Sequence, residues 1–67
     1  MKIRAKKRFS ALRVKKGLSI NQLAKQMDVN QSVVSKLEHG LPIRPATAQK
    51  ACKALNEPFD SLFIIED

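Results

Sequence analysis

The sequence has 67 residues, of which 43% are hydrophobic, and this is enough for one small domain that spans residues 1–67. A domain of this length buries only about 60% of the surface that its unfolded chain exposes, so its stability depends on close packing or on a partner. The single cysteine excludes an internal disulfide and indicates a reducing, cytoplasmic setting. No apolar run is long enough to predict a signal peptide or a membrane span.

The formal charge of +7 is unevenly distributed along the chain. Eight of the 13 basic residues lie in the first sixteen positions, which contain no acidic residue. Four of the six acidic residues are Glu57, Asp60, Glu66 and Asp67. A polarised basic surface indicates a polyanionic partner such as nucleic acid, and the alternative is a surface that only keeps the protein soluble.

The first helix is predicted from the apolar residues Ala5, Phe9 and Leu12, which are spaced by four and three positions. We expect this helix to run from about Ala5 to Lys16. Basic residues then lie at its negative end, and Gly17 is suited to the left-handed conformation that follows a helix.

Two further helices are predicted by their capping residues. Ser19 and Gln22 have the spacing of a capping box, in which each side chain accepts a hydrogen bond from the other residue's backbone N–H. This predicts a helix over Ile20–Met27. Asn30 is a good N-cap and predicts the next helix over about Gln31–His39. The connection between the two helices has the length of a helix-turn-helix.

The helix that begins at Gln31 has one face suited to DNA. Val34 and Leu37 are expected in the core, and Gly40 marks the helix end. The residues left on the outer face are Gln31, Ser32, Val33, Ser35 and Lys36. A face with an amide, hydroxyls, a methyl-bearing residue and a cation, but no acid, is compatible with reading base edges in a major groove. The alternative for each residue is an ordinary solvated surface.

The C-terminal half is predicted to add two helices. Pro45 suits the first turn of a helix that ends near Leu55, and Asn56 suits the left-handed position after it. Cys52 falls on the apolar stripe of this helix, where a small core residue is a simpler interpretation than a metal ligand or a reactive thiol. Pro58 opens a short last helix, which we expect to contain the apolar residues Phe59, Leu62 and Phe63.

The tail Phe63–Asp67 is too short for another helix and contains β-branched residues. It has two open alternatives: pairing with Met1–Arg4 in a two-stranded sheet, or serving as an apolar edge for a second subunit. Met1–Arg4 is accordingly expected to be either a short strand or a frayed tail.

The sequence has little material for catalysis. His39 is the only histidine, and Glu38 beside it faces a different side of the helix. There is no glycine-rich phosphate loop and no carboxylate pair at a useful spacing. We therefore expect no enzyme, no metal site and no cofactor.

These residues resemble the phage repressor and Cro (XRE) family of helix-turn-helix DNA-binding proteins from about Phe9 to Phe63. The resemblance is carried by Leu12-Arg13, Gly17-Leu18-Ser19, Leu23-Ala24, Val29-Asn30-Gln31-Ser32, Val34-Ser35, Leu37-Glu38, Gly40, Pro45 and Leu55. It implies an all-α, five-helix, lambda-repressor-like fold in which the second and third helices form the helix-turn-helix. It also implies a regulator of transcription that binds double-stranded DNA, more readily a repressor than an activator.

The resemblance also assigns residue roles. Arg13 and Glu38 match a structural ion pair between the first and third helices. The positions that contact bases match Gln31, Ser32 and Lys36, with Val33 and Ser35 nearby. The positions that contact phosphates match Ser19, His39 and Arg44, and more loosely Arg8. One departure concerns Ile20, because the family often has a glutamine there that braces the first glutamine of the recognition helix.

A homodimer is expected because one recognition helix reads too few bases for useful specificity. The interface candidates are Phe59, Phe63, Ile64 and Ile65, with core burial as their alternative. The rival hypothesis is an antitoxin or antirepressor that acts mainly through a protein partner. RNA binding is disfavoured because the three phenylalanines are expected in the core and no other aromatic residue is available for stacking. The expected location is the bacterial cytoplasm, at the nucleoid.

Overall fold

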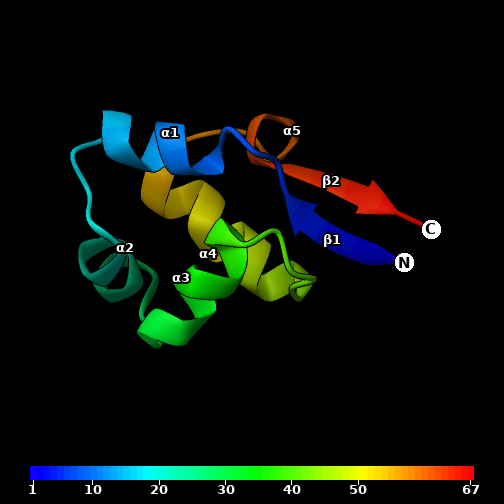
Figure 1. Cartoon of the computed structure of the whole chain (residues 1–67), viewed down its shortest axis with the longest axis horizontal. Coiled ribbons are helices and arrows are strands. Elements are labelled where there is room, and N and C mark those ends of the chain that lie inside the picture. Colours follow the sequence, from blue (N-terminus) through cyan, green and yellow to red (C-terminus); the bar gives the residue numbers. More distant parts are fainter.

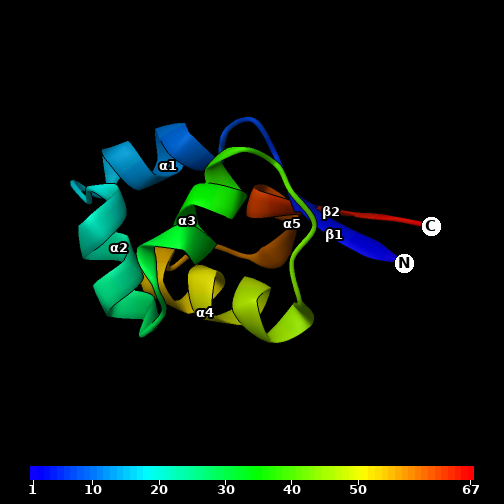
Figure 2. The same ribbon diagram turned by 60° about the horizontal axis from the view of Figure 1, so that its bottom comes forward.

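The computed structural model describes all 67 residues, which form five helices and two short strands joined by turns and loops (Figure 1). In chain order the elements are β1 (Lys2–Ala5), α1 (Phe9–Lys15), α2 (Ile20–Met27), α3 (Gln31–Glu38), α4 (Pro45–Leu55), α5 (Phe59–Leu62) and β2 (Phe63–Glu66). The helices form one body, and the β1–β2 ribbon projects from it with both chain termini at its far end (Figures 1 and 2). This is the predicted all-α domain with a terminal ribbon. None of the helices has the length and the apolar character needed to cross a membrane.

Every element contributes to one core of twelve buried apolar residues. These are Ile3, Phe9, Leu23, Ala24, Met27, Val34, Leu37, Ala48, Ala51, Leu55, Leu62 and Phe63. The Phe63 ring lies between the other two phenylalanines, with centroids 6.0 Å from Phe9 and 5.3 Å from Phe59. No buried side-chain nitrogen or oxygen lacks a hydrogen-bond partner. Apolar packing against residues from every other element therefore fixes the position of α3.

The first four helices end in the same way. One or two residues after the last residue of each helix, a residue has a left-handed backbone, with φ of +74° at Gly17, +57° at Asp28, +68° at Gly40 and +53° at Asn56. Its N–H donates to the carbonyl three residues back, and the next N–H donates five residues back, at 2.9 to 3.3 Å. This is the Schellman motif, which satisfies the last carbonyls of a helix. The role was predicted for Gly17, Gly40 and Asn56, but not for Asp28.

The terminal ribbon corrects both ends of the predicted helix pattern. Ala5 pairs with Phe63 in the antiparallel sheet, so α1 begins at Phe9 and not at Ala5. The predicted apolar spacing at Ala5 is real, but hydrogen bonds to a distant strand decide its conformation. Phe63 likewise begins β2 instead of ending the last helix. At 1% exposure it belongs to the core, which rules out the predicted place at a subunit surface.

The two predicted helix caps differ in the structure. The capping box of α2 is present, with Gln22 N–H donating to Ser19 Oγ at 3.1 Å and Ser19 N–H donating to Gln22 Oε1 at 2.8 Å. Asn30 occupies the N-cap position of α3, but its side chain accepts no capping hydrogen bond. The prediction for Asn30 was therefore right in position and wrong in mechanism. The α3 helix itself ends at Glu38, one residue before the predicted end.

Candidate nucleic-acid interface

The α3 helix presents a continuous outer face. Gln31, Ser32 and Lys36 are exposed, whereas Val33 and Ser35 are half-buried at the margins of the same face. The opposite face carries Val34 and Leu37 into the core. The packing of these two residues in the core fixes which way the outer face points. The structure thus brings together all five residues that were predicted to contact bases.

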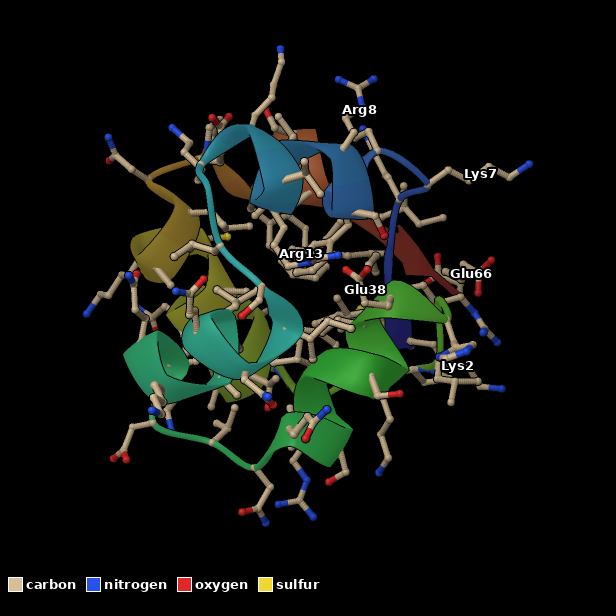
Figure 3. All side chains as sticks on the ribbon, turned by 60° about the vertical axis from the view of Figure 1, so that its left-hand side comes forward. Lys2, Lys7, Arg8, Arg13, Glu38 and Glu66 are labelled. Atoms are coloured by element: carbon tan, nitrogen blue, oxygen red, sulfur yellow. The ribbon has the colours of Figure 1, made fainter.

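The only acidic residue of α3 is turned inward. Arg13 of α1 donates from Nη2 to Glu38 Oε1 at 3.0 Å and from Nε to Oε2 at 3.4 Å. Figure 3 shows the two side chains facing each other between α1 and α3. Both side chains are 13% exposed, so water screens this pair only weakly. The predicted ion pair is present, and it leaves no carboxylate on the outer face of α3.

Two additional bonds fix this pair. The Ser10 hydroxyl donates to Glu38 Oε1 at 2.6 Å, and Arg13 Nη1 donates to the Leu18 carbonyl at 2.7 Å. The arginine therefore joins α1, the loop before α2 and the end of α3. Because each charged group has several partners, the cost of removing it from water is well compensated. The network holds the end of α3 against α1 and the loop before α2.

A groove runs beside α3 toward the start of α4. It is lined by Val33, Lys36, Pro42, Ile43, Arg44 and Thr47. Lys36 and Arg44, predicted to contact a base and a phosphate respectively, thus border the same hollow. Both side chains are exposed, and no hydrogen bond or salt bridge engages either of them. Two cations without protein partners at one groove give it a positive potential.

The other predicted phosphate contacts lie in different places. Ser19 is exposed at the start of α2, but its hydroxyl is engaged in the capping box. His39 follows α3, and its Nδ1–H donates to the Ser35 carbonyl at 2.7 Å, which leaves Nε2 without a protein partner. Arg8 is exposed on the outer side of α1, where Figure 3 shows it extending away from α3. The structure therefore does not bring Arg8 to the recognition face.

Half of the basic residues in the N-terminal segment have internal partners. Arg4 bonds the Glu66 carboxylate and the Gly40 carbonyl, Lys6 bonds the Asp60 carbonyl, and Lys16 lies 3.6 Å from Glu57. Arg13 is held by Glu38. The residues left without such partners are Lys2, Lys7, Arg8 and Lys15. Much of the local charge excess therefore stabilises the fold and is not displayed to a partner.

Ile20 and Gln22 leave Gln31 without a brace from α2. The Ile20 side chain is half-buried and packs against the core. The Gln22 amide is occupied by the capping box. Gln31 is exposed, and its side chain makes no hydrogen bond within the protein.

The helix-turn-helix family model matches residues 9–62 of the chain. This match covers α1 through α5 and most of the chain. The chain belongs to the XRE family of helix-turn-helix proteins. A search of curated proteins finds no match. Membership of the XRE family makes the protein a DNA-binding regulator of transcription.

Sequence reasoning missed three features of this XRE-family site. Ser10 had no local signal, because its role depends on Glu38, which lies 28 residues away in the sequence. Thr47 lines the groove only because α4 returns beside α3. Asp28 has a left-handed backbone in the turn, and a glycine at this position would have predicted that conformation from the sequence.

Proposed function

We propose that this protein is a homodimeric repressor that places α3 of each subunit in the major groove of double-stranded DNA. The two copies read inverted half-sites about 34 Å apart, one turn of the double helix. The observation that carries the proposal is the outer face of α3. It exposes an amide, a hydroxyl and a cation, while the one carboxylate of the helix is bonded inward to Arg13 and Ser10.

The side chains on this face match the chemistry of base edges. The Gln31 amide is suited to adenine, which offers a donor and an acceptor side by side, and the Lys36 ammonium is suited to the acceptors of guanine. The half-buried Val33 offers a methyl surface to a thymine. Ser32 and Ser35 add hydroxyls that hydrogen-bond to either kind of base.

Phosphate contacts are assigned to the two ends of the helix-turn-helix. Ser19 lies at the positive end of α2, where backbone N–H groups favour an anion. Arg44 and the free Nε2 of His39 lie beyond the end of α3, on the way to α4. These contacts carry no sequence information. Their role is to fix the register of α3 in the groove. Arg8 reaches only DNA that extends past α1.

The unbraced Gln31 has a consequence for specificity. A side chain that must be ordered on binding loses rotamer entropy, about 1.5–2 kcal/mol for a glutamine. Lys36 is also exposed and has no partner within the protein, and a lysine loses a similar rotamer entropy. We therefore expect Gln31 and Lys36 to contribute comparably to sequence discrimination.

The test is a binding selection on random duplex DNA with the wild-type chain, Gln31→Ala and Lys36→Ala. The proposal predicts an inverted repeat for the wild type and relaxed preference at one position of each half-site for either variant. Only weak, salt-sensitive and sequence-independent binding would contradict it. That result would favour the rival hypothesis of an antitoxin or antirepressor with a protein partner.

A further inference from the structure

The β2 strand has an edge that the rest of the chain leaves uncovered beyond its first N–H group. The sheet has only two strands, so each strand has one edge that its neighbour does not use. The edge of β1 is partly covered, because the Ile43 N–H donates to the Ile3 carbonyl at 2.9 Å. Figure 1 shows β2 on the side of the ribbon away from α3 and α4, with only α5 beside its start. An uncovered edge offers backbone groups to an additional strand.

The strand register shows which backbone groups point outward. The Lys6 N–H donates to the Leu62 carbonyl at 2.7 Å, so the Leu62 carbonyl faces β1. Successive residues of a strand direct their backbone groups to opposite edges. The groups of Ile64 therefore face β1, as its pairing with Arg4 requires. The groups of Phe63 and Ile65 face the uncovered edge.

One of these outward groups is already bonded. The Phe63 N–H donates to the carbonyl of Phe59, the first residue of α5. The edge therefore offers, in order, the Phe63 carbonyl, the N–H and carbonyl of Ile65, and the N–H of Asp67. This series is an acceptor, a donor with an acceptor, and a donor. Read antiparallel, it is complementary to itself with Ile65 at the centre.

An identical strand thus satisfies every free group of the edge. In such a pair Ile65 and the partner's Ile65 would exchange two hydrogen bonds, and each Asp67 N–H would donate to the backbone carbonyl of Phe63 of the partner subunit. A two-fold axis perpendicular to the sheet keeps equivalent residues on the same face. The axis must therefore pass beside a residue. An axis between two residues would pair side chains that point to opposite faces of the sheet.

The side chains at this edge are apolar at its centre. Ile65 is 54% exposed and shares a face with Ile3, its partner in the register. It borders a mostly apolar groove lined by Met1, Ile3, Pro45, Gln49, Cys52, Glu57, Pro58, Phe59 and Ile65. In a symmetric pair the two Ile65 side chains would be direct cross-strand neighbours, with Cβ atoms about 4.5–5.5 Å apart. Their contact would remove two exposed apolar side chains from water.

Charge also favours this end of the molecule. Two copies of a chain with a formal charge of +7 repel each other at most surfaces. Four of the six acidic residues lie between Glu57 and Asp67, so the repulsion is weakest near β2. Glu66 is paired with Arg4 of its own chain and does not add an unpaired charge to the edge.

We propose that two copies of this chain join through the free edge of β2, antiparallel and centred on Ile65, to form a four-stranded sheet. The inference deepens the proposed function, because it names the surface that supplies the two-fold axis of the inverted repeat. It uses no contact with DNA. Of the predicted interface residues, Ile65 lies at the centre, Ile64 lies on the opposite face of the sheet, and Phe59 lines the adjoining groove.

Cross-linking tests the register directly. In a Cys52→Ala background, Ile65→Cys would place two thiols on a hydrogen-bonded pair with Cα atoms about 5.5 Å apart, within disulfide range. We expect mild oxidation to give a covalent dimer. Ile64→Cys is the matched control, because its partner across the new interface is Glu66 and not itself. Equal cross-linking of both variants, or none for Ile65→Cys, would overturn the register.

Sedimentation of the full chain without DNA tests the interface itself. We expect a wild-type dimer at tens of micromolar. Ile65→Lys should raise the dimer dissociation constant roughly thirtyfold or more, because it opposes two like charges and removes apolar contact. Ile64→Lys adds the same charge on the other face and should change it less than about threefold.

A wild-type monomer, or a dimer equally stable in both lysine variants, would overturn the proposal. A monomer would leave the groove beside β2 for a different protein partner. A dimer that binds no specific DNA would instead remove the proposed function and leave this interface standing.

Discussion

Arg13 and Glu38 join α1 to the end of α3 through two hydrogen bonds of 3.0 and 3.4 Å, with both side chains 13% exposed. The pair is separated by 25 residues in the sequence and is completed by the Ser10 hydroxyl. It has two effects on the recognition helix. It holds the end of α3 against α1, and it keeps the only carboxylate of α3 away from the outer face.

Glu38→Gln should destabilise the fold by about 2 kcal/mol, because it leaves the weakly hydrated Arg13 without its counter-charge. For a domain of this size the loss corresponds to a fall in Tm of roughly 10 °C. Urea and thermal unfolding measure both quantities. Ser10→Ala is the companion variant and should cost about 1.5 kcal/mol, since it removes one hydrogen bond to a charged group. A Glu38→Gln protein as stable as the wild type would show that the pair does not hold α3.

The left-handed helix ends predict opposite effects for glycine and alanine. Gly17→Ala should cost about 1 kcal/mol, although nothing lies within 4 Å of the added Cβ, because only the backbone is strained. Asp28→Gly should stabilise by about 0.5 kcal/mol, since the relief of strain exceeds the added entropy of the unfolded chain. Ala11→Gly, inside α1, is the control and should destabilise by about 1 kcal/mol. Chemical denaturation would contradict this account if Asp28→Gly and Ala11→Gly changed stability in the same direction.

The two helix caps predict unequal effects of the same kind of change. Ser19→Ala should cost about 1 kcal/mol, because it breaks the capping box of α2. Asn30→Ala should cost less than about 0.3 kcal/mol, because the Asn30 side chain makes no capping bond to lose. Equilibrium unfolding of the two variants under one set of conditions makes the comparison. Equal losses would mean that Asn30 caps α3 in solution.

Cys52 should react slowly with alkylating reagents. Burial raises the pKa of the Cys52 thiol, an effect that a backbone hydrogen bond only partly offsets. Less thiolate is then present at neutral pH than in an unfolded chain, and the thiolate is the reactive form. As pH is raised, the alkylation rate of the native protein should increase at a higher pH than that of the denatured protein. Mass spectrometry after treatment with iodoacetamide measures both rates. Because the folded pKa is raised, the associated stability is complete below the unfolded pKa and decreases as pH rises through the folded value. A native thiol that reacts as fast as the denatured one would contradict this.

The sequence predicted the elements whose signals are local. The start of α2 is determined by the capping box of Ser19 and Gln22, which lie within one turn of each other. The ends of α1 and α3 are determined by the left-handed backbone of Gly17 and Gly40. The outer face of α3 also followed from the period of its apolar residues. These signals were sufficient for the helix-turn-helix and for the choice of its exposed side chains.

Features that depend on distant contacts were not predictable. Ala5 continues the apolar period of α1, but its pairing with Phe63 makes it part of a strand. An apolar residue such as Phe63 looks the same in a sequence whether it lies in a core or at an interface. Its packing against Phe9 and Phe59 places it in the core. Ser10 is one of five serines in the sequence, and it acquires its role from its hydrogen bond to Glu38.

The most direct test of the central claim, that the outer face of α3 reads DNA, is the ratio of affinities for a selected duplex and a scrambled duplex. At physiological salt we predict a ratio of at least about 1,000 for the wild type. Lys36→Ala should reduce this ratio by roughly tenfold or more, because the lost contact is to a base. Lys53→Ala, which removes the same charge from the exposed end of α4, should leave the ratio unchanged. A wild-type ratio near one, or equal loss of both affinities in Lys36→Ala, would contradict the claim.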